Sequence, residues 1–74
     1  MKFIGLVGCG YWGKNLIREF YNLNVLHTIC DLNETLLNSY RSDYSDLNFT
    51  TNWNSLLTNE DITAICVSLP AALH

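Results

Sequence analysis

Three glycines, Gly8, Gly10 and Gly13, stand in the spacing G-x-G-x-x-G directly after a short apolar run. This spacing suits the pyrophosphate of a dinucleotide when a strand precedes it and a helix follows it. Gly8 lets the chain turn out of the strand, Gly10 lets the backbone approach the phosphates, and Gly13 lets the helix lie close to the strand. The unpaired N–H groups of the first helical turn then face the phosphates, with the positive end of the helix dipole behind them.

An acidic residue stands at the end of the second apolar run. Asp31 lies 18 positions after Gly13, close to the offset of about 20 residues at which a carboxylate accepts hydrogen bonds from the adenosine ribose. A carboxylate there repels a 2′-phosphate, and the next residue, Leu32, supplies no positive charge. We therefore expect NAD as the cofactor, with NADP less favoured. The alternative is that Asp31 is a turn or helix-cap residue ahead of Asn33.

Other residues that could do chemistry have simpler interpretations. Tyr11 and Trp12 either border the dinucleotide or pack over the start of the first helix. Lys14 is interpreted as a solvated helix residue, and His27, inside a strand, as structural or surface rather than catalytic. We expect three further aromatic residues to belong to the core or its rim: Tyr40, Tyr44 and Trp53.

The cysteines do not form a recognisable framework. Cys9, Cys30 and Cys66 are odd in number and widely spaced, and no CxxC occurs. This pattern predicts neither disulfides nor a metal site. Cys30 and Cys66 lie in apolar runs, where cysteine behaves as a small buried hydrophobe.

The elements that must position these residues follow from the apolar pattern. Strands are predicted at residues 2–7, 25–30, 47–50 and 62–69. Helices are predicted from residue 11 or 12 to 22, after Asn33 as a cap, and briefly after Asn52. We expect these residues to face inward: Gly13, Leu16, Ile17, Phe20 and Leu23 in the first helix, and Leu36, Leu37 and Tyr40 in the second. The third helix is expected to contain Trp53, Leu56 and Leu57.

This alternation predicts an α/β fold, a Rossmann-type, mostly parallel sheet with right-handed crossovers, in the order βαβαβαβ. In that fold strand four lies beside strand one at the centre of the sheet. A chain that ends after strand four would expose an apolar strand edge. We therefore expect residues 1–74 to be the N-terminal portion of a longer protein, truncated after the fourth strand, or to have a partner at that edge.

Composition narrows the classes of partner. The chain has 74 residues and a net charge of −3, and it has no basic cluster, which argues against nucleic acid. No apolar run approaches the roughly 18 residues of a membrane span, and no signal peptide is recognisable. We expect no membrane partner and a cytoplasmic location.

With these residues placed, the chain resembles the N-terminal part of the glucose–fructose oxidoreductase / inositol dehydrogenase (Gfo/Idh/MocA) family. The resemblance spans essentially the whole chain and rests on segments 7–16, 30–31, 52–57 and 61–70, followed by His74. The wording of residues 10–16 and 70–74 is most similar to members that oxidise nucleotide-linked sugars.

This resemblance implies an NAD-binding Rossmann domain followed by an α/β domain, absent from this chain, that binds the sugar and mediates homo-oligomerisation. It implies hydride transfer between a sugar or nucleotide-sugar carbinol and nicotinamide C4. The pyrophosphate would be surrounded by Gly8, Gly10, Tyr11, Trp12 and Gly13, and the adenosine ribose held by Asp31. The nicotinamide half would lie along Ser68, Leu69, Pro70 and His74.

The chain departs from the family at one visible position and lacks its later motifs. Leu69 stands where the family usually has threonine or another small polar residue. The family's catalytic lysine, in a Glu-Lys-Pro motif, and its acid/base follow further along the chain. We therefore expect no catalytic residue in residues 1–74 and no sugar turnover by this chain alone.

Two other functions fit parts of the pattern. One is a non-catalytic NAD-binding or redox-sensing module. The other is a methyltransferase, whose glycine-rich loop also follows a first strand. The full G-x-G-x-x-G spacing and residues 70–74 disfavour the methyltransferase.

Overall fold

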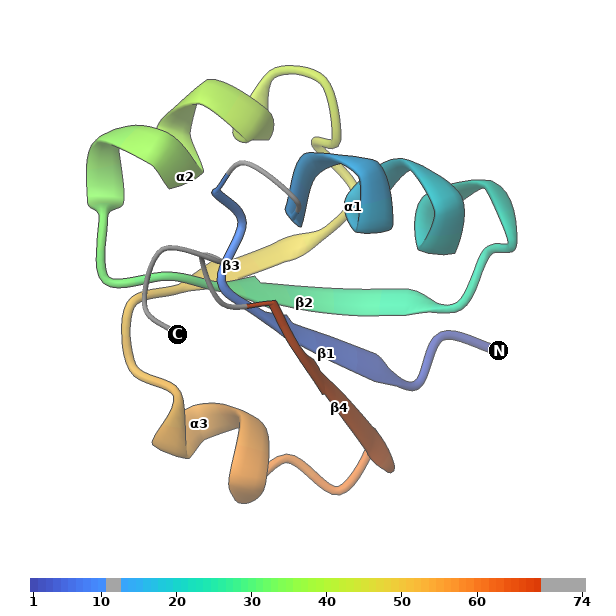
Figure 1. Cartoon of the computed structure of the whole chain (residues 1–74). Coiled ribbons are helices and arrows are strands. Elements are labelled where there is room, and N and C mark those ends of the chain that lie inside the picture. The colour runs from blue at the N-terminus through green and yellow to red at the C-terminus, as the bar shows by residue number, and fades with distance from the viewer. Residues whose placement is uncertain (11–12, 69–74) are drawn as a thin grey trace.

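One parallel sheet organises the fold. The structure is a computed structural model, and it describes residues 1–10 and 13–68. Within these ranges the order is β1 (Ile4–Val7), α1 (Gly13–Asn22), β2 (Leu26–Cys30), α2 (Glu34–Arg41), β3 (Asn48–Thr50), α3 (Asn54–Leu57) and β4 (Ala64–Val67). The strands pair in parallel in the order β3-β2-β1-β4. Helices α1 and α2 cover one face and α3 the other (Figure 1). The predicted α/β Rossmann-type architecture, with strand four beside strand one, is confirmed.

The main core lies between the sheet and the pair α1 and α2. It consists of side chains that are almost completely buried: Leu6, Cys9, Ile17, Leu26, Ile29, Leu37 and Leu47. Of the side chains expected to face inward from α1 and α2, Ile17 and Leu37 are fully buried. The others, apart from Gly13 and Leu23, are partly buried against this core: Leu16, Phe20, Leu36 and Tyr40.

An irregularity in β2 allows two of these core residues to share a face. The β1–β2 register pairs Ile4 with Leu26 but Gly5 with Thr28, so His27 is an extra residue in β2. In a regular strand, residues three apart point to opposite faces. Because of the extra residue, Leu26 and Ile29 both join the core on the α1 and α2 side.

The end of α1 corrects one expectation. Leu23 was expected to face inward, but it is 68% exposed. The helix ends in a Schellman motif, in which Asn24 has φ 59°, Asn24 N–H donates to Tyr21 O (3.0 Å) and Val25 N–H donates to Phe20 O (3.2 Å). This motif turns the chain back toward β2 and leaves Leu23 at the solvent side of the helix end.

All four strands begin later than predicted. Residues 2–3, 25, 47 and 62–63 precede β1, β2, β3 and β4 as the structure has them. Backbone hydrogen bonds nevertheless continue there, since Phe3 N–H donates to Val25 O (2.9 Å) and Thr63 N–H donates to Phe3 O (3.0 Å). Residue 69, the predicted end of the fourth strand, lies outside the described residues.

The short helix α3 also differs from its predicted form. Its N-cap is Trp53, which makes no side-chain capping bond, rather than Asn52. The Asn52 side chain still stabilises the start of this helix, because its Oδ1 accepts the N–H of Asn54, the first helical residue (3.0 Å). At this helix Leu56 is buried, whereas Trp53 and Leu57 are more than half exposed.

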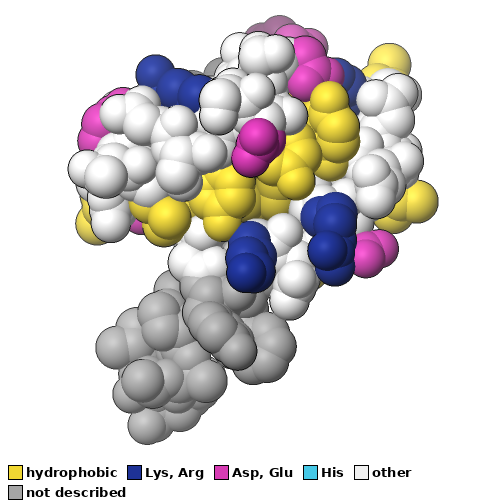
Figure 2. Space-filling view, turned by 90° about the horizontal axis from the view of Figure 1, so that it is seen from above, with side chains coloured by type: hydrophobic (Ala, Val, Ile, Leu, Met, Phe, Trp, Pro, Cys, Tyr) yellow, Lys and Arg dark blue, Asp and Glu magenta, His cyan; other side chains and the backbone are white. Residues whose placement is uncertain are grey.

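The outer surface shows no charge of one sign gathered over α1 and α2. Figure 2 views this face, where Lys, Arg, Asp and Glu side chains are scattered among apolar and uncharged ones. Among residues 1–10 and 13–68, no helix has the length and apolar character needed to cross a membrane.

Candidate functional site

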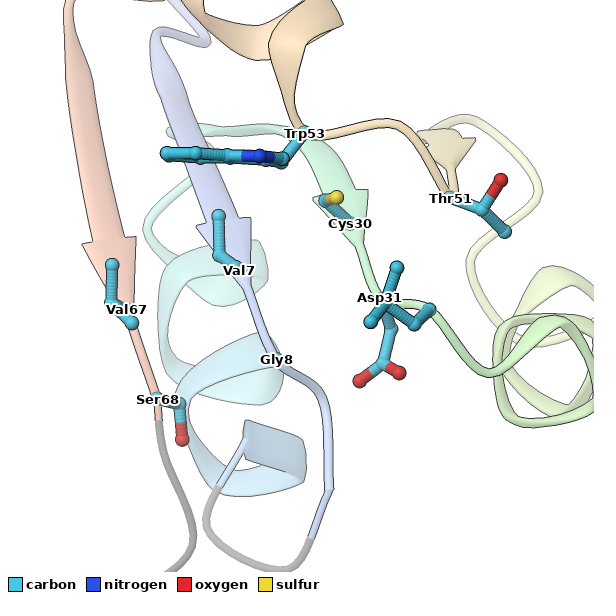
Figure 3. A pocket seen from close by; sticks show the side chains of 9 residues that line it. Val7, Gly8, Cys30, Asp31, Thr51, Trp53, Val67 and Ser68 are labelled. Atoms are coloured by element: carbon cyan, nitrogen blue, oxygen red, sulfur yellow. The ribbon is translucent and has the colours of Figure 1, made fainter.

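An open pocket with a volume of about 580 Å³ lies at the carboxyl ends of the strands. In parallel α/β sheets, ligands bind at this edge, where neighbouring connections lead to opposite faces. Here β1 leads into α1 on one face, whereas β3 reaches β4 through α3 on the other (Figure 1). The lining comes from the ends of three strands and from the β3–α3 connection (Figure 3): Val7, Gly8, Cys30, Asp31, Leu32, Thr51, Trp53, Val67 and Ser68.

Gly8 makes the turn that the sequence predicts. Its φ is +87°, in the left-handed region that favours glycine. A Cβ at this position would collide with the carbonyl oxygen of Ser68. The turn is fixed from both sides, because Gly8 N–H donates to Cys30 O (2.8 Å) and Ser68 N–H donates to Val7 O (2.8 Å).

Gly13 allows the predicted close approach of α1 to the strand before it. A Cβ on Gly13 would lie 2.6 Å from the carbonyl oxygen of Gly8, closer than real side chains approach. The helix therefore begins directly behind the turn at Gly8. Its first turn lies near the carboxyl end of β1, where the Lys14 N–H donates to the carbonyl oxygen of Gly10 (3.3 Å).

Gly10 has a different environment from the other two glycines. It is exposed, and a Cβ there would meet no described atom of the protein within 4 Å. Residues 1–10 and 13–68 therefore give no steric reason for a glycine at this position. Open space over a backbone without a Cβ fits a ligand that lies against the main chain, as the pyrophosphate of a dinucleotide does.

The Asp31 carboxylate ties the glycine-rich loop to the start of α2. Its Oδ2 accepts the backbone N–H of Cys9 (2.9 Å) and its Oδ1 accepts that of Asn33 (2.8 Å). Asn33 in turn caps α2 as predicted, because its Oδ1 accepts the Leu36 N–H (3.1 Å). Asp31 therefore has the turn role that the sequence analysis gave as the alternative to ribose binding. An ionised carboxylate can accept about four hydrogen bonds, so Asp31 keeps capacity for a ligand hydroxyl.

Hydrogen bonding keeps Asp31 charged despite its surroundings. Partial burial by itself would raise the pKa of Asp31, but the N–H groups of Cys9 and Asn33 and the Cys9 thiol favour the charged form more strongly. The pKa of Asp31 therefore lies below its ordinary value. The carboxylate is ionised at neutral pH and can only accept hydrogen bonds there.

The same contacts suppress the reactivity of Cys9. Its thiol is buried and lies 3.6 Å from Asp31 Oδ2. Burial first, and then the charge of Asp31, raise the pKa of Cys9 to about 12. Burial and the same charge also raise the pKa of Cys30. Both groups are thiols rather than thiolates at neutral pH, and all three cysteines are free.

Helix α2 provides a second hold on the loop. The Tyr40 hydroxyl donates to the carbonyl oxygen of Cys9 (3.3 Å). Cys9 is therefore held at its N–H and thiol by Asp31 and at its C=O by Tyr40. Tyr40 was expected to be only a core or rim aromatic, and this hydrogen bond was not foreseen.

The structure brings together part of the predicted site. Gly8, Asp31 and Ser68 line the pocket, and Gly10 and Gly13 belong to the adjoining loop and helix. The remaining predicted site residues lie outside the described residues: Tyr11, Trp12, Leu69, Pro70 and His74. Pocket residues that the sequence analysis did not assign to the site are Val7, Cys30, Leu32, Thr51, Trp53 and Val67. The signal that could have indicated Trp53 was an aromatic residue three positions after the predicted end of the third strand.

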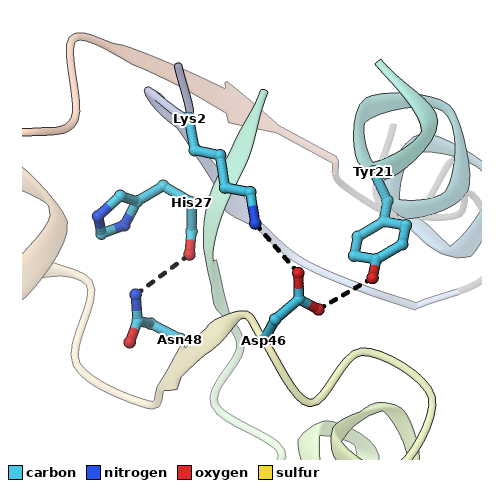
Figure 4. Close-up of polar contacts among 5 residues, drawn as sticks. All are labelled: Lys2, Tyr21, His27, Asp46 and Asn48. Atoms are coloured by element: carbon cyan, nitrogen blue, oxygen red, sulfur yellow. Dashed lines mark hydrogen bonds and ion pairs between the residues drawn. The ribbon is translucent and has the colours of Figure 1, made fainter. Parts of the chain in front are cut away.

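His27 lies away from this pocket. It is in β2, near the amino ends of the strands, and its Nδ1 lies 2.6 Å from Thr28 Oγ1. Asn48 Nδ2 donates to His27 O (3.4 Å), and nearby Asp46 accepts from Lys2 Nζ (3.0 Å) and from the Tyr21 hydroxyl (2.9 Å) (Figure 4). The Asn48 contact joins β3 to β2 at His27, and the Asp46 contacts join the segment before β3 to α1 and to the segment before β1. The two contacts of His27 indicate a structural role.

Within the described ranges, no group of three or more His, Cys, Asp or Glu side chains could hold a metal ion. Comparisons with known proteins do not narrow the class of function either. No protein-family model matches the chain, and no curated protein is significantly similar to it. The chemistry that the pocket offers is a glycine turn beside a helix start, an ionised carboxylate and an apolar wall.

Proposed function

We propose that this chain is the dinucleotide-binding portion of an NAD-dependent oxidoreductase. The observation that carries the proposal is the arrangement at one end of the sheet. There the Gly8 turn, the start of α1 at Gly13 and the Asp31 carboxylate adjoin one pocket. These are the groups that a pyrophosphate and its adenosine ribose require.

The residues fit NAD as follows. The open backbone at Gly10 and the first-turn N–H groups of α1 would receive the pyrophosphate, with Tyr11 and Trp12 bordering it. Asp31 would accept hydrogen bonds from the ribose hydroxyls, and its charge would oppose the 2′-phosphate of NADP. Ser68, Leu69, Pro70 and His74 would lie along the nicotinamide half. When bound, the nicotinamide supplies the hydride donor or acceptor.

The substrate class rests on the resemblance to the Gfo/Idh/MocA family. It points to hydride transfer to or from a sugar or nucleotide-sugar carbinol, in a cytoplasmic homo-oligomer whose substrate domain follows this portion. Residues 1–74 would then bind the cofactor without performing the catalytic proton transfer.

A non-catalytic NAD-binding or redox-sensing module is the alternative. Gly8, Gly13 and Asp31 bind and orient in either case and do not react. The two functions differ in turnover by the longer protein that the proposal implies, because residues 1–74 alone should reduce no NAD in either case. NAD reduction by that longer protein, measured with a panel of sugars and nucleotide sugars, separates them. Reduction by any member of the panel supports the oxidoreductase.

Isothermal titration calorimetry tests the proposed ligand. NADH should bind, NADPH should bind at least tenfold more weakly because of its 2′-phosphate, and S-adenosylmethionine should not compete. Asp31→Ala should weaken NADH binding, whereas Asp43→Ala, which removes an exposed carboxylate outside the pocket, should not. Tighter binding of S-adenosylmethionine, or no binding of NADH, would contradict the proposal.

A further inference from the structure

We infer that Trp53 forms a stacking surface for the adenine base, at the end of the pocket opposite the glycine turn. This inference rests on the proposed dinucleotide function and names the residue that would recognise the base. It assigns a binding role to an aromatic residue that the sequence suggested only as core or rim.

The placement of Trp53 is the first argument. Trp53 is the N-cap of α3 and comes from the β3–α3 connection, far in sequence from the glycine-rich loop. In Figure 3 its indole extends from the start of α3 across β1, on the side of Val7 away from Gly8, and it lines the pocket. The side chain is 54% exposed, so a large aromatic face is available to a ligand.

The order of polar and apolar groups along the pocket is the second argument. The Asp31 carboxylate lies level with Gly8 in Figure 3, whereas Trp53 lies beyond Val7. In an adenine nucleotide, the phosphate, ribose and base follow one another in that order. A ribose held by Asp31 with its phosphate at the Gly8 loop would direct its base away from the loop, toward Trp53.

The chemistry of the wall is the third argument. Apart from Asp31, Thr51 and Ser68, the described lining consists of Gly8 and of apolar or weakly polar side chains: Val7, Cys30, Leu32, Trp53 and Val67. Leu32, directly after Asp31, is 89% exposed. A flat heteroaromatic ring gains by contact with such surfaces, and base–aromatic stacking is a strong, geometry-tolerant contribution to nucleotide binding.

The chain offers a matched control for this role. Leu57 lies in the same helix and is similarly exposed, at 56%, but it does not line the pocket. Truncation of Leu57 therefore removes exposed apolar surface from α3 without touching the proposed base site. Trp53→Phe keeps an aromatic face and tests whether stacking, rather than bulk, is what matters.

The experiment measures binding of AMP, nicotinamide mononucleotide and NADH to the protein by ¹H–¹⁵N NMR titration. The indole N–H signal of Trp53 is identified from the spectrum of Trp53→Phe, and the spectra also report whether each variant is folded. We expect AMP to shift this signal in the native protein. We expect Trp53→Ala to weaken AMP and NADH binding by about tenfold, Trp53→Phe to retain most of the affinity, and Leu57→Ala to match the native protein. Affinity for nicotinamide mononucleotide, which lacks adenine, should not change.

The outcomes separate the two proposals. If NADH binds and Trp53→Ala binds AMP as tightly as the native protein does, the role of Trp53 is wrong and the dinucleotide function stands. If AMP binds through Trp53 but NADH does not bind, the base site stands and the dinucleotide function is wrong. If neither ligand binds the native protein, both are wrong. An equal loss of affinity for AMP and nicotinamide mononucleotide in Trp53→Ala would also overturn the role of Trp53.

Discussion

At the scale of single residues, Asp31 makes the turn contacts that the sequence presented as an alternative to ribose binding, and it also lies at the pocket. It holds the N–H groups of Cys9 and Asn33 and it lines the pocket. The structural contacts orient the carboxylate before any ligand arrives, which lowers the entropic cost of binding. A turn residue and a ligand-binding residue are therefore compatible interpretations of the same side chain.

The lowered pKa of Asp31 predicts how stability depends on pH. A carboxyl group whose pKa is lower in the folded state contributes stability above its unfolded pKa of about 3.9, and this contribution is lost as pH falls through the folded value. We expect urea unfolding to show a loss of stability below pH about 4 that is smaller in Asp31→Asn. Asp43→Asn is the control and should retain the full loss. If the native protein and Asp31→Asn lose the same free energy of unfolding at low pH, the contribution of Asp31 to stability is wrong.

Cys9 gives a prediction about chemical reactivity. Its thiol is buried, and its pKa is raised to about 12, so almost no thiolate exists at pH 8. Iodoacetamide should therefore modify Cys9 much more slowly in the folded protein than in urea, where all three cysteines react alike. Peptide mass spectrometry after a timed reaction measures this. Rapid native modification of Cys9, with Cys66 as the partly exposed comparison, would show that the thiol is not held as described.

At the scale of elements, the three glycines differ in what they do for the fold. Gly8→Ala would place a methyl group against the Ser68 carbonyl in a backbone region that alanine avoids. We expect it to lower the free energy of unfolding by about 2 kcal/mol or more, measured by urea denaturation. Gly10→Ala meets open space and should leave stability nearly unchanged while weakening NADH binding. Equal stability losses for both variants would contradict this division.

The elements also show which local features a sequence can predict. Asn33 as a cap and the end of the first helix at residue 22 follow from short-range features, and both are confirmed. The exposure of Leu23 and the shift of the α3 cap to Trp53 depend on how the chain leaves one element for the next. The extra residue at His27 depends on cross-strand register. Helical and strand periodicity carry no information about such long-range pairing.

At the scale of the whole molecule, sheet order was predictable because right-handed crossovers leave few topologies. The full set of residues that line the pocket was not predictable from the sequence. Trp53 and Asp31 line the same pocket only because β3 pairs with β2 and the chain then crosses to the opposite face of the sheet. The residues that carry a motif were identified from sequence, whereas those brought to the pocket by topology required the structure.

Ligand binding should appear in the stability of the whole molecule. A ligand that binds only the folded state at a hundred times its Kd stabilises it by about 2.7 kcal/mol, which in a domain of this size raises Tm by roughly 10–20 °C. We expect this shift with NADH and a smaller one with NADPH, measured by differential scanning calorimetry. Asp31→Ala should show less stabilisation by NADH, and the absence of any shift in the native protein would contradict NADH binding.

The contact between Ser68 and Gly8 has a kinetic consequence. Strands β1, β2 and β3 can pair between neighbours in sequence, but β4 pairs with β1 only after nearly the whole chain has closed into a loop, which delays this pairing. Because that pairing brings Ser68 over Gly8, we expect the pocket to be completed late in folding, after the rate-limiting barrier. A saturating dinucleotide should then slow unfolding in stopped-flow experiments and leave the refolding rate unchanged. A ligand that binds this pocket would therefore stabilise the folded state without helping the chain to fold.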